Sequence, residues 1–429
     1  MKKSILLLVF AGLLLGSGIQ AQSDFSLGDY SLDDSSQIKV GVWFENHFNS
    51  NVISNSMYYN QLFKTTLSRS SQESMKGRLF KRNRAGNQET ERIYASYKGK
   101  NSTDSTGLTH FVTAGVRRSV VSGFGRDVFL LTALGNKQFA GTTADLDYLE
   151  VELMQYMQVQ YGVIRQTPNW TYGAAVGFLM GNRYLDISSE KSGVYTSSIG
   201  DTLHGFAKGS IYSSDTNSRN IFDINGYGAS IDLFLAKRLD LFKKHDGAGE
   251  IRFEVNDLGF ISWNDRSVEY TVDGEYTWTG IDAPNLFDIS DSLFNDQVPD
   301  DLEGKFVKER KGGSFTRMLN PRIAIYHIEQ LNDRVLLKNM IDYRFNAHQL
   351  PYIASSQFVR INKDPGAWNY TMNFYESVAG YGFVGLGLGF GIDHEKFNFL
   401  IGSRNLIAMM SPDYLSGSNV HFGFHWKFR

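Results

Sequence analysis

The last ten residues of the chain, 420–429, alternate strictly between apolar side chains and polar or small ones. Because successive side chains of a β-strand point to opposite faces, this segment predicts a strand with one apolar and one polar face. An exposed strand with an aromatic face at a chain terminus would promote aggregation in water, but it suits a strand that closes a barrel in lipid. We therefore predict that the strand serves barrel assembly through Phe422, Phe424, Trp426 and Phe428.

The same alternation recurs along much of the chain. It covers residues 38–45, 157–163, 172–180, 227–235, 251–256, 384–392 and 397–401. After residue 21 there is no run of about 18 or more apolar residues, so only a barrel could span a membrane. We predict an all-β fold, a transmembrane antiparallel β-barrel, and the length allows ~12 to 16 strands.

Segments without this alternation predict loops and caps. Residues 188–220 are rich in serine and glycine and predict an extracellular loop, because barrels of this kind place their long loops outside. Residues 49–101 are polar and predict a long loop or a plug. Residues 282–318 combine acidic and basic stretches and predict a cap or loop.

The direction of the chain is ambiguous in one place. Short turns at 165–170, 239–248 and 393–396 are expected on the periplasmic side, together with the C-terminus. Counting strands back from the C-terminus makes 319–329 descend, whereas counting forward from the first turn makes it ascend. Either a weak strand lies between residues 300 and 318, around 305–310, or one strand prediction is wrong.

Two segments predict short helices instead of strands. Asp127 is placed to cap a helix through Val128, Leu131 and Leu134, with Gly135 as its stop. A second helix is expected at residues 286–294, within the acidic stretch. Since neither helix could face lipid, we expect both to plug the lumen or to cap its periplasmic mouth.

The N-terminus has the layout of a secretory signal peptide. Lys2 and Lys3 precede an apolar run at residues 5–15, and Ala21 offers a small residue at the cleavage position. A spanning helix needs about 20 apolar residues, so this run is too short. We predict a signal peptide at 1–21 and a single domain at 22–429, with a retained anchor helix as the alternative.

Composition narrows the class further. The chain has 22 Tyr, 31 Phe, 6 Trp and 42 Gly against 7 Pro, which is typical of transmembrane barrels, although a large soluble β protein could share these numbers. It has no cysteine, which excludes a disulfide scaffold. Its 43 basic and 45 acidic residues are mixed along the chain, so no nucleic-acid partner is expected.

Polar or small residues on the face opposite the apolar one are candidates for the lumen surface. They are Glu152, Gln158, Gln160, Arg252, Glu254, Gly385, Gly387, Gly389, His421 and His425. Their mixed polarity suits a wet or plugged interior better than a greasy tunnel. The glycines at every second position of 385–391 do not match a phosphate-binding loop, and we expect them to let a plug approach the wall or to leave room in the lumen.

No motif predicts a catalytic, cofactor-binding or metal site. A G-x-S-x-G elbow, an H-E-x-x-H helix, a Walker loop and an EF-hand loop are all absent from the sequence. His421 and His425 share a strand face but lie ~13 Å apart, too far to act together. Acidic residues between 288 and 301 could hold Ca²⁺, with a solvated loop as the favoured interpretation. Basic residues between 76 and 92 could bind lipopolysaccharide phosphates outside, or peptidoglycan and acidic partners in the periplasm, with a solvated charge run as the favoured interpretation.

Residues 257–263, Asp-Leu-Gly-Phe-Ile-Ser-Trp, together with 134–141, 177–182, 279–282 and 403–406, carry a resemblance. They resemble the signature of an uncharacterised Gram-negative outer-membrane barrel family that is itself similar to the FadL and PorV barrels. The resemblance runs over most of the mature chain. It implies a barrel of about fourteen strands whose lumen is partly filled by N-terminal or inserted segments.

One feature of that family is missing, because the Asn-Pro-Ala triplet that often follows its signal peptide does not occur here. Within the signature we expect structural roles for Asp257, Gly259 and Trp263. The strand should end in a turn at Gly259, with Phe260 and Trp263 as aromatic residues at the membrane interface.

Three functions remain open at this stage. The first is a FadL-like channel for small or amphipathic solutes, which predicts an apolar pocket inside the barrel. The second is a scaffold subunit of an outer-membrane complex, which predicts a filled lumen and an exposed docking surface. The third, an outer-membrane hydrolase, ranks last, and we predict no enzyme and no cofactor. The expected location is the outer membrane of a Gram-negative bacterium, with its lipids and lipopolysaccharide, the barrel-assembly machinery and an outer-membrane protein as partners.

Overall fold

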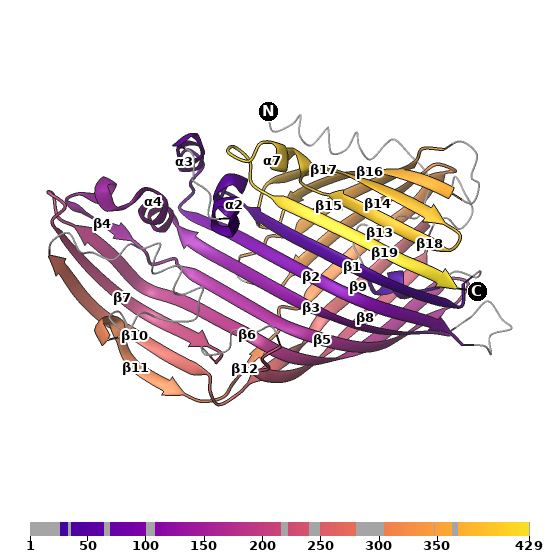
Figure 1. Cartoon of the computed structure of the whole chain (residues 1–429), viewed down its shortest axis with the longest axis horizontal. Helices are drawn as coiled ribbons and strands as arrows, with labels where there is room; N and C mark the ends of the chain where they lie inside the picture. Colours follow the sequence, from indigo (N-terminus) through magenta and orange to yellow (C-terminus); the bar gives the residue numbers. More distant parts are fainter. Residues whose placement is uncertain are drawn as a thin grey trace.

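The computed structural model is a closed antiparallel β-barrel (Figure 1). It describes residues 26–32, 36–63, 69–99, 108–215, 222–239, 249–279, 304–346, 348–362 and 368–428. Fourteen of the described strands form the wall. In order around the wall they are β1 (Ile38–Ser50), β2 (Arg82–Lys98), β3 (Leu108–Gly125), β5 (Glu150–Gln166), β6 (Trp170–Thr196), β8 (Gly226–Arg238), β9 (Gly249–Trp263), β13 (Arg322–Asn332), β14 (Val335–Arg344), β15 (Tyr352–Arg360), β16 (Trp368–Ala379), β17 (Val384–His394), β18 (Phe397–Ser403) and β19 (Ser418–Phe428).

The C-terminal strand closes the barrel. β19 pairs with β18 on one side and with β1 on the other, in register from Ile38 opposite Phe428 to Phe48 opposite Ser418. The predicted fold class, a transmembrane antiparallel barrel of about fourteen strands, is therefore confirmed.

Apolar side chains of the wall strands point outward and are exposed, whereas the polar residues between them point inward and are buried. Trp170, Trp368 and Phe428 lie in this outer face near the ends of their strands. Because so many exposed apolar side chains suit hydrocarbon and not water, the outer face is the lipid-facing belt of the barrel. Its exposed members include Val40, Val42, Ile93, Val112, Val176, Phe178, Leu233, Phe253, Ile341, Leu388 and Trp426.

The two ends of the barrel differ in their connections. At one end lie the short turns 167–169, 333–334 and 395–396, together with the start of β1 and the end of β19. We call this the short-turn end, marked by the C-terminus in Figure 1, and the other the long-loop end. The turns expected at 165–170 and 393–396 thus share one end, while most of 239–248 lies outside the described residues.

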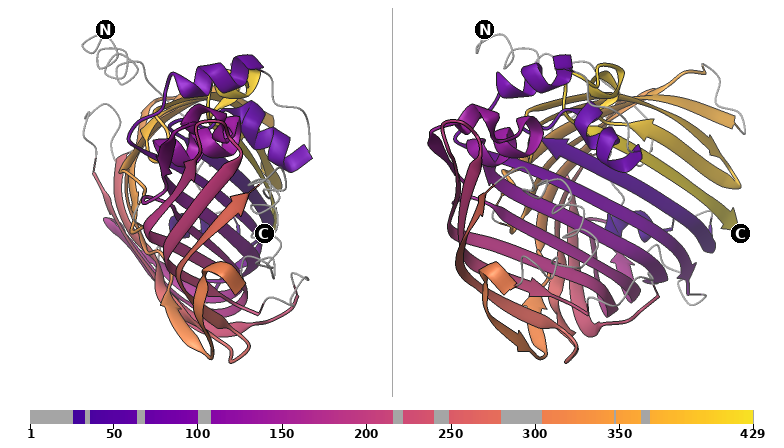
Figure 2. Two further views of the ribbon diagram at one scale, coloured as in Figure 1. Left: turned by 90° about the vertical axis from the view of Figure 1, so that its left-hand side faces the viewer. Right: turned by 60° about the vertical axis from the view of Figure 1, so that its left-hand side comes forward.

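At the long-loop end the wall continues into an extension of five strands, coloured magenta to orange in Figure 2. β7 pairs with the upper part of β6 and with β10, β10 pairs with β11, β4 pairs with β6, and β12 pairs with β9. Their bounds are β4 (Thr142–Asp145), β7 (Thr202–Ser213), β10 (Val268–Thr279), β11 (Val307–Gly312) and β12 (Phe315–Met318).

The extension corrects the predicted loop at 188–220. Residues 188–196 continue β6, and residues 202–213 form β7. These strands lie beyond the lipid-facing belt, where both faces of a sheet can be polar, so the alternation that signals a membrane strand is absent.

The predicted loop or plug at 49–101 is also wrong in large part. Residues 82–98 form β2, and two short helices precede it, α2 (Asn55–Phe63) and α3 (Arg69–Lys76). β2 is polar on its outer face only above the belt, where Glu89 pairs with Arg118 of β3 at 2.6 Å. Its inner face is polar because it lines the lumen. With polar residues on both faces, the upper part of β2 lacks the apolar–polar alternation that identifies a membrane strand.

The ambiguity in chain direction is resolved by the extension. β10 is antiparallel to β7 and therefore continues in the direction of β9, which adds no reversal. A weak strand does lie near 305–310, namely β11, and β13 then descends beside β9. Part of the cap predicted at 282–318 is thus β11 and β12, and residues 280–303 lie outside the described part.

The helix predicted at 127–134 is confirmed as α4 (Arg126–Leu134), which ends at Gly135 with φ 78°. Asp127 does not cap it, because the N-cap is Gly125. α4 packs with Phe48, Phe124 and α2 at the long-loop end, and not at the end with the short turns, where the prediction placed it (Figure 1). The helix predicted at 286–294 lies outside the described residues. In the described part of the chain, no helix has the length and apolar character needed to cross a membrane.

Candidate functional site

An N-terminal segment, residues 26–32, lies inside the barrel near the short-turn end, and we call it the plug. It contains one 3-10 turn, η1 (Leu27–Tyr30). Tyr30 is fully buried and stacks on Phe111 of β3, with ring centroids 4.3 Å apart. The plug fits the N-terminal lumen filling that the family resemblance implies. Leu27 and Tyr30 share an apolar cluster with side chains from five wall strands, Tyr94, Phe111, Ile164, Ala175, Phe234 and Ala236.

Two cations of the wall hold the plug backbone and its polar side chains. Arg252 of β9 donates through Nη1 to the Ser26 hydroxyl at 2.5 Å and lies 3.6 Å from the Asp29 carboxylate. Lys39 of β1 donates through Nζ to the carbonyl oxygens of Asp29 at 2.5 Å and Ser31 at 2.8 Å. Charged donors on buried carbonyls and hydroxyls make strong hydrogen bonds, so these contacts fix the plug in one position.

The upper side of the plug meets a third cation. Arg92 of β2 donates to the Tyr30 hydroxyl at 2.7 Å. At Gly28 an added Cβ would lie only 2.7 Å from Cζ of Arg252, so the plug can approach that guanidinium only with glycine at this position.

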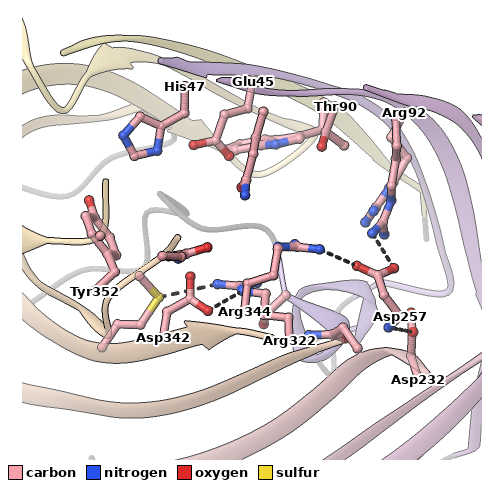
Figure 3. Close-up of a pocket in the computed structure, with 18 of the residues that line it drawn as sticks. Glu45, His47, Thr90, Arg92, Asp232, Asp257, Arg322, Asp342, Arg344 and Tyr352 are labelled. Carbon is pink, nitrogen blue, oxygen red and sulfur yellow. Dashed lines mark hydrogen bonds and ion pairs between the residues drawn. The ribbon is translucent and has the colours of Figure 1, made fainter. Parts of the chain in front are cut away.

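Above the plug, towards the long-loop end, lies a cavity with a volume of about 140 Å³. In Figure 3, Glu45 and His47 of β1 and Arg92 of β2 face Arg322 of β13 and Arg344 of β14 across it. Most of the lining side chains are charged or carry amide or hydroxyl groups. The lumen therefore holds a polar compartment and not the apolar pocket that the transport hypothesis expected.

Asp257 is the centre of an ion-pair network that crosses this compartment. Its carboxylate contacts Arg117 of β3 at 2.5 Å and Arg344 of β14 at 3.1 Å, and it is 1% exposed. Its backbone NH donates to Asp232 at 2.7 Å, and Asp232 also accepts from Gln160 at 2.6 Å. A carboxylate so deeply buried needs cationic partners, and here two arginines from opposite parts of the wall supply them.

The backbone at Asp257 explains why this residue points inward. It has φ 61°, and the register between β8 and β9 shifts next to it, which is a β-bulge. The expected turn at Gly259 is wrong, because β9 continues to Trp263 and an added Cβ at Gly259 would meet the Ala229 carbonyl at 2.2 Å. Trp263 is buried, and not at an interface, because the bulge shifts the alternation of β9 by one residue and turns Trp263 inward, whereas Phe260 faces outward.

Two further ion pairs line the cavity. Arg322 contacts Asp342 at 2.8 Å, and Arg404 contacts Glu45 at 3.2 Å. Positive and negative groups are therefore paired around the compartment, which favours small polar occupants over bulky apolar ones.

The structure places the predicted lumen residues inside the barrel but does not gather them into one site. Gln160 lines the cavity and Arg252 holds the plug. Gln158 donates to Ser230 at 3.0 Å, and Glu152 accepts from Asn320 at 3.0 Å. The others, Glu254, His421 and His425, are buried elsewhere in the lumen.

The predicted glycines have a different role from the expected one. An added Cβ at Gly387 would lie 1.9 Å from the Ser403 carbonyl, and one at Gly385 would lie 2.1 Å from the Asn405 side chain. One at Gly389 would lie 2.8 Å from the Tyr375 hydroxyl. Glycine at these positions allows neighbouring strands and side chains to lie in close contact. It neither makes room for a plug nor leaves the lumen open, as had been expected.

Several residues of the site were not predicted from the sequence. Arg117 lies on β3, whose alternation could have revealed an inward position had 108–125 been identified as a strand. Tyr30, Asp232, Asp342 and Arg344 carry no motif, and only the closed barrel brings them to one cavity.

The predicted basic cluster at 76–92 does not form one surface. Arg84 and Arg92 point into the lumen, where Arg84 donates to the Gly380 carbonyl at 3.2 Å and Arg92 reaches the plug. Arg82 lies over the Tyr148 ring, 4.2 Å from its centroid. Arg92 lies ten residues beyond Arg82 along β2, which separates the two side chains by roughly 33 Å along the strand.

Among the described residues no group of three or more His, Asp or Glu side chains could hold a metal ion. The acidic residues 288–301 lie outside the described part of the chain. The prediction that the protein is not an enzyme stays a prediction.

Comparison with known proteins gives one family. A model described as "Family of unknown function (DUF5723)" matches residues 31–403. The predicted resemblance to an uncharacterised barrel family is thereby confirmed. No curated protein matches in sequence.

Among solved structures, the toluene transporter TodX of P. putida is 10% identical, with a TM-score of 0.42 over 93% of this chain and 91% of that one. The toluene transporter TbuX of Ralstonia pickettii is 9% identical, with a TM-score of 0.33 over 92% and 90%. The translocator domain of the autotransporter NalP from Neisseria meningitidis is 8% identical, with a TM-score of 0.35 over 92% and 90%. These scores are low, so the fold rests on the strand pairing within the chain itself.

Proposed function

The chain belongs to this family of unknown function, and on that premise we propose that the protein is a channel in the outer membrane of a Gram-negative bacterium. It passes small polar solutes through the lumen when the plug leaves its position. The short-turn end faces the periplasm, as in other barrels with short turns on one side and long loops on the other.

One observation carries the proposal, namely a polar cavity directly above a plug made of a single short segment. The cavity has room for several water molecules or one small polar solute. The plug is held in place by hydrogen bonds and by the packing of Leu27 and Tyr30, and the chain continues from it into β1. Release of seven residues, 26–32, would open the compartment towards the short-turn end.

A liposome-swelling assay with small polar solutes tests the proposal. The full chain carrying Tyr30→Ala loses the plug's main buried ring, so solute entry should rise above that of the unchanged protein. Tyr97→Ala is the matched control, because Tyr97 is an exposed tyrosine of β2 on the lipid-facing belt. Swelling that stays at the level of empty liposomes for both the Tyr30 variant and a variant lacking 26–32 would reject a channel.

A second candidate function, a scaffold subunit, is supported by the extension. An apolar pocket of about 280 Å³ lies there, beyond the lipid-facing belt. An apolar pocket in water suits a partner or ligand. This candidate would be favoured if a stoichiometric partner co-purifies with the protein and is lost with Phe206→Ser, while liposomes containing the protein show no swelling. The apolar lining includes Ile187, Val194, Leu203, Phe206, Val272, Trp278 and Phe306.

A further inference from the structure

Two loops at the long-loop end fold into the mouth of the barrel. One connects β14 to β15 and contains Asn346 and His348, and the other connects β16 to β17 and contains Gly380 and Tyr381. The first loop crosses the lumen towards β3, which stands opposite β15 in the wall with six strands between them in either direction.

His348 reaches the far wall from this loop. Its Nε2 lies 2.9 Å from the Glu150 carboxylate at the start of β5. Its ring covers Gly123 of β3 so closely that an added Cβ there would lie 2.3 Å from the imidazole. Glycine at 123 thus provides the space in which the imidazole rests.

Tyr381 makes the corresponding contact from the second loop. Its ring is buried, lines the cavity and lies over Gly86 of β2, where an added Cβ would lie 2.4 Å from the ring. Two glycines of the wall, on neighbouring strands, therefore receive one ring each.

The two loops brace each other. Asn346 donates to the Tyr381 hydroxyl at 2.7 Å, and the Leu350 NH donates to the Gly380 carbonyl at 3.2 Å. At the base of the second loop, Ala379 has φ 70° and Gly380 has φ 66°. A left-handed alanine is uncommon, and this bend directs Tyr381 into the mouth and not away from it.

We propose that His348 and Tyr381 form a lid that closes the cavity at the long-loop end. The lumen is then a compartment with two closures, the plug on one side and the lid on the other, and a solute enters only when the lid lifts. The inference rests on the proposed channel function for the identity of what enters, but the closure itself is a property of the two rings and their glycines.

Accessibility of the cavity tests the lid directly. The natural chain has no cysteine, so Thr90→Cys places a single thiol in the cavity wall. A charged, water-soluble methanethiosulfonate reagent applied to the full chain reports how often the cavity opens. Adding Tyr381→Ala removes the ring from Gly86 and should raise the labelling rate by about tenfold or more, which corresponds to about 1.4 kcal/mol of lost closure.

Two further variants complete the design. Gly123→Val displaces His348 from the other half of the lid and should also speed labelling. Phe383→Ala is the matched control, since Phe383 lies in the same loop as Tyr381 but is exposed. It should leave the labelling rate unchanged. The shift in gel mobility between heated and unheated samples shows which variants form a closed barrel.

Faster labelling in either lid variant with a folded barrel supports the lid. Unchanged labelling in both, with folded barrels, overturns it. The channel is scored separately by solute entry after removal of the plug in the Tyr381→Ala variant, where the lid no longer blocks the mouth. Faster labelling without solute entry would keep the lid and reject the channel, whereas solute entry with unchanged labelling would keep the channel and reject the lid.

Discussion

The guanidinium of Arg252 donates to the hydroxyl of Ser26, a residue 226 positions earlier in the chain, at a distance of 2.5 Å. This bond joins the N-terminal plug to β9, a wall strand that is distant from the plug in the sequence. It shows how the barrel uses a charged wall residue to hold a short segment that could not form a stable structure alone.

The first prediction follows from that bond. Arg252→Met keeps the length of the side chain but removes the donor to Ser26, and a hydrogen bond to a charged group contributes about 2 kcal/mol. Plug release should therefore rise roughly 30-fold, seen as more frequent openings in single-channel recordings. Arg238→Met, on an exposed residue at the end of β8, should open no more often than the unchanged protein.

The second prediction concerns the ion pairs of Asp257. Asp257→Asn leaves Arg117 and Arg344 without their buried counter-charge, and breaking such a pair costs about 3 kcal/mol. Urea unfolding in lipid vesicles should show this loss of stability. Asp273→Asn is the contrast, because the Asp273–Lys308 pair at 2.7 Å is exposed and its loss should change little. Equal effects of the two substitutions would argue against a buried network.

The third prediction tests the depth of the lipid-facing belt. Phe424→Arg places a cation near the middle of the outward face of β19 and should cost about 2–4 kcal/mol of unfolding free energy. Phe428→Arg, at the short-turn rim of the same strand, should cost about 1 kcal/mol or less. A reversed order would mean that the belt is positioned differently along the barrel.

The fourth prediction gives the lid a pH dependence. Burial lowers the pKa of His348 in the closed lid, and the nearby Glu150 carboxylate only partly opposes this. Once the lid lifts, the imidazole regains its ordinary pKa of about 6.5, so protonation favours the open lid. Closure is complete above that pH and weakens as the pH falls through the lower pKa of the closed state.

Labelling of Thr90→Cys should therefore quicken on acidification. The intrinsic pH dependence of the reagent is removed by reference to Ile199→Cys, a fully accessible site in the extension, where Ile199 is 82% exposed. With His348→Gln the corrected rate should be flat between pH 7.5 and pH 5, because the variant lacks the lid imidazole whose protonation favours the open state. A rate that falls on acidification would contradict the assignment.

Much of the barrel wall could be predicted from alternation, because lipid imposes one strict rule on outward side chains. Residues 420–428 and 172–180 obey it and form β19 and the lower part of β6. β2 could not be recognised, since its upper half rises above the lipid and carries polar residues on both faces.

The candidate site was less accessible to sequence reasoning. Arg252 and Gln160 could be assigned to the inner face from their strand positions. Asp257 was singled out from a signature, but its inward position depends on a bulge that alternation does not report. Tyr30 and Tyr381 lie in segments without periodicity, and only closure of the barrel gives them their partners.

Single-channel conductance of the Tyr381→Ala variant, in which the lid no longer closes the mouth, before and after removal of residues 26–32, tests the central claim most directly. The plug and its contacts predict a protein that is mostly closed when intact and a stable, open conductance once the segment is removed. A shortened protein that forms a closed barrel in the bilayer yet carries no current would contradict a lumen whose passage is controlled by this segment.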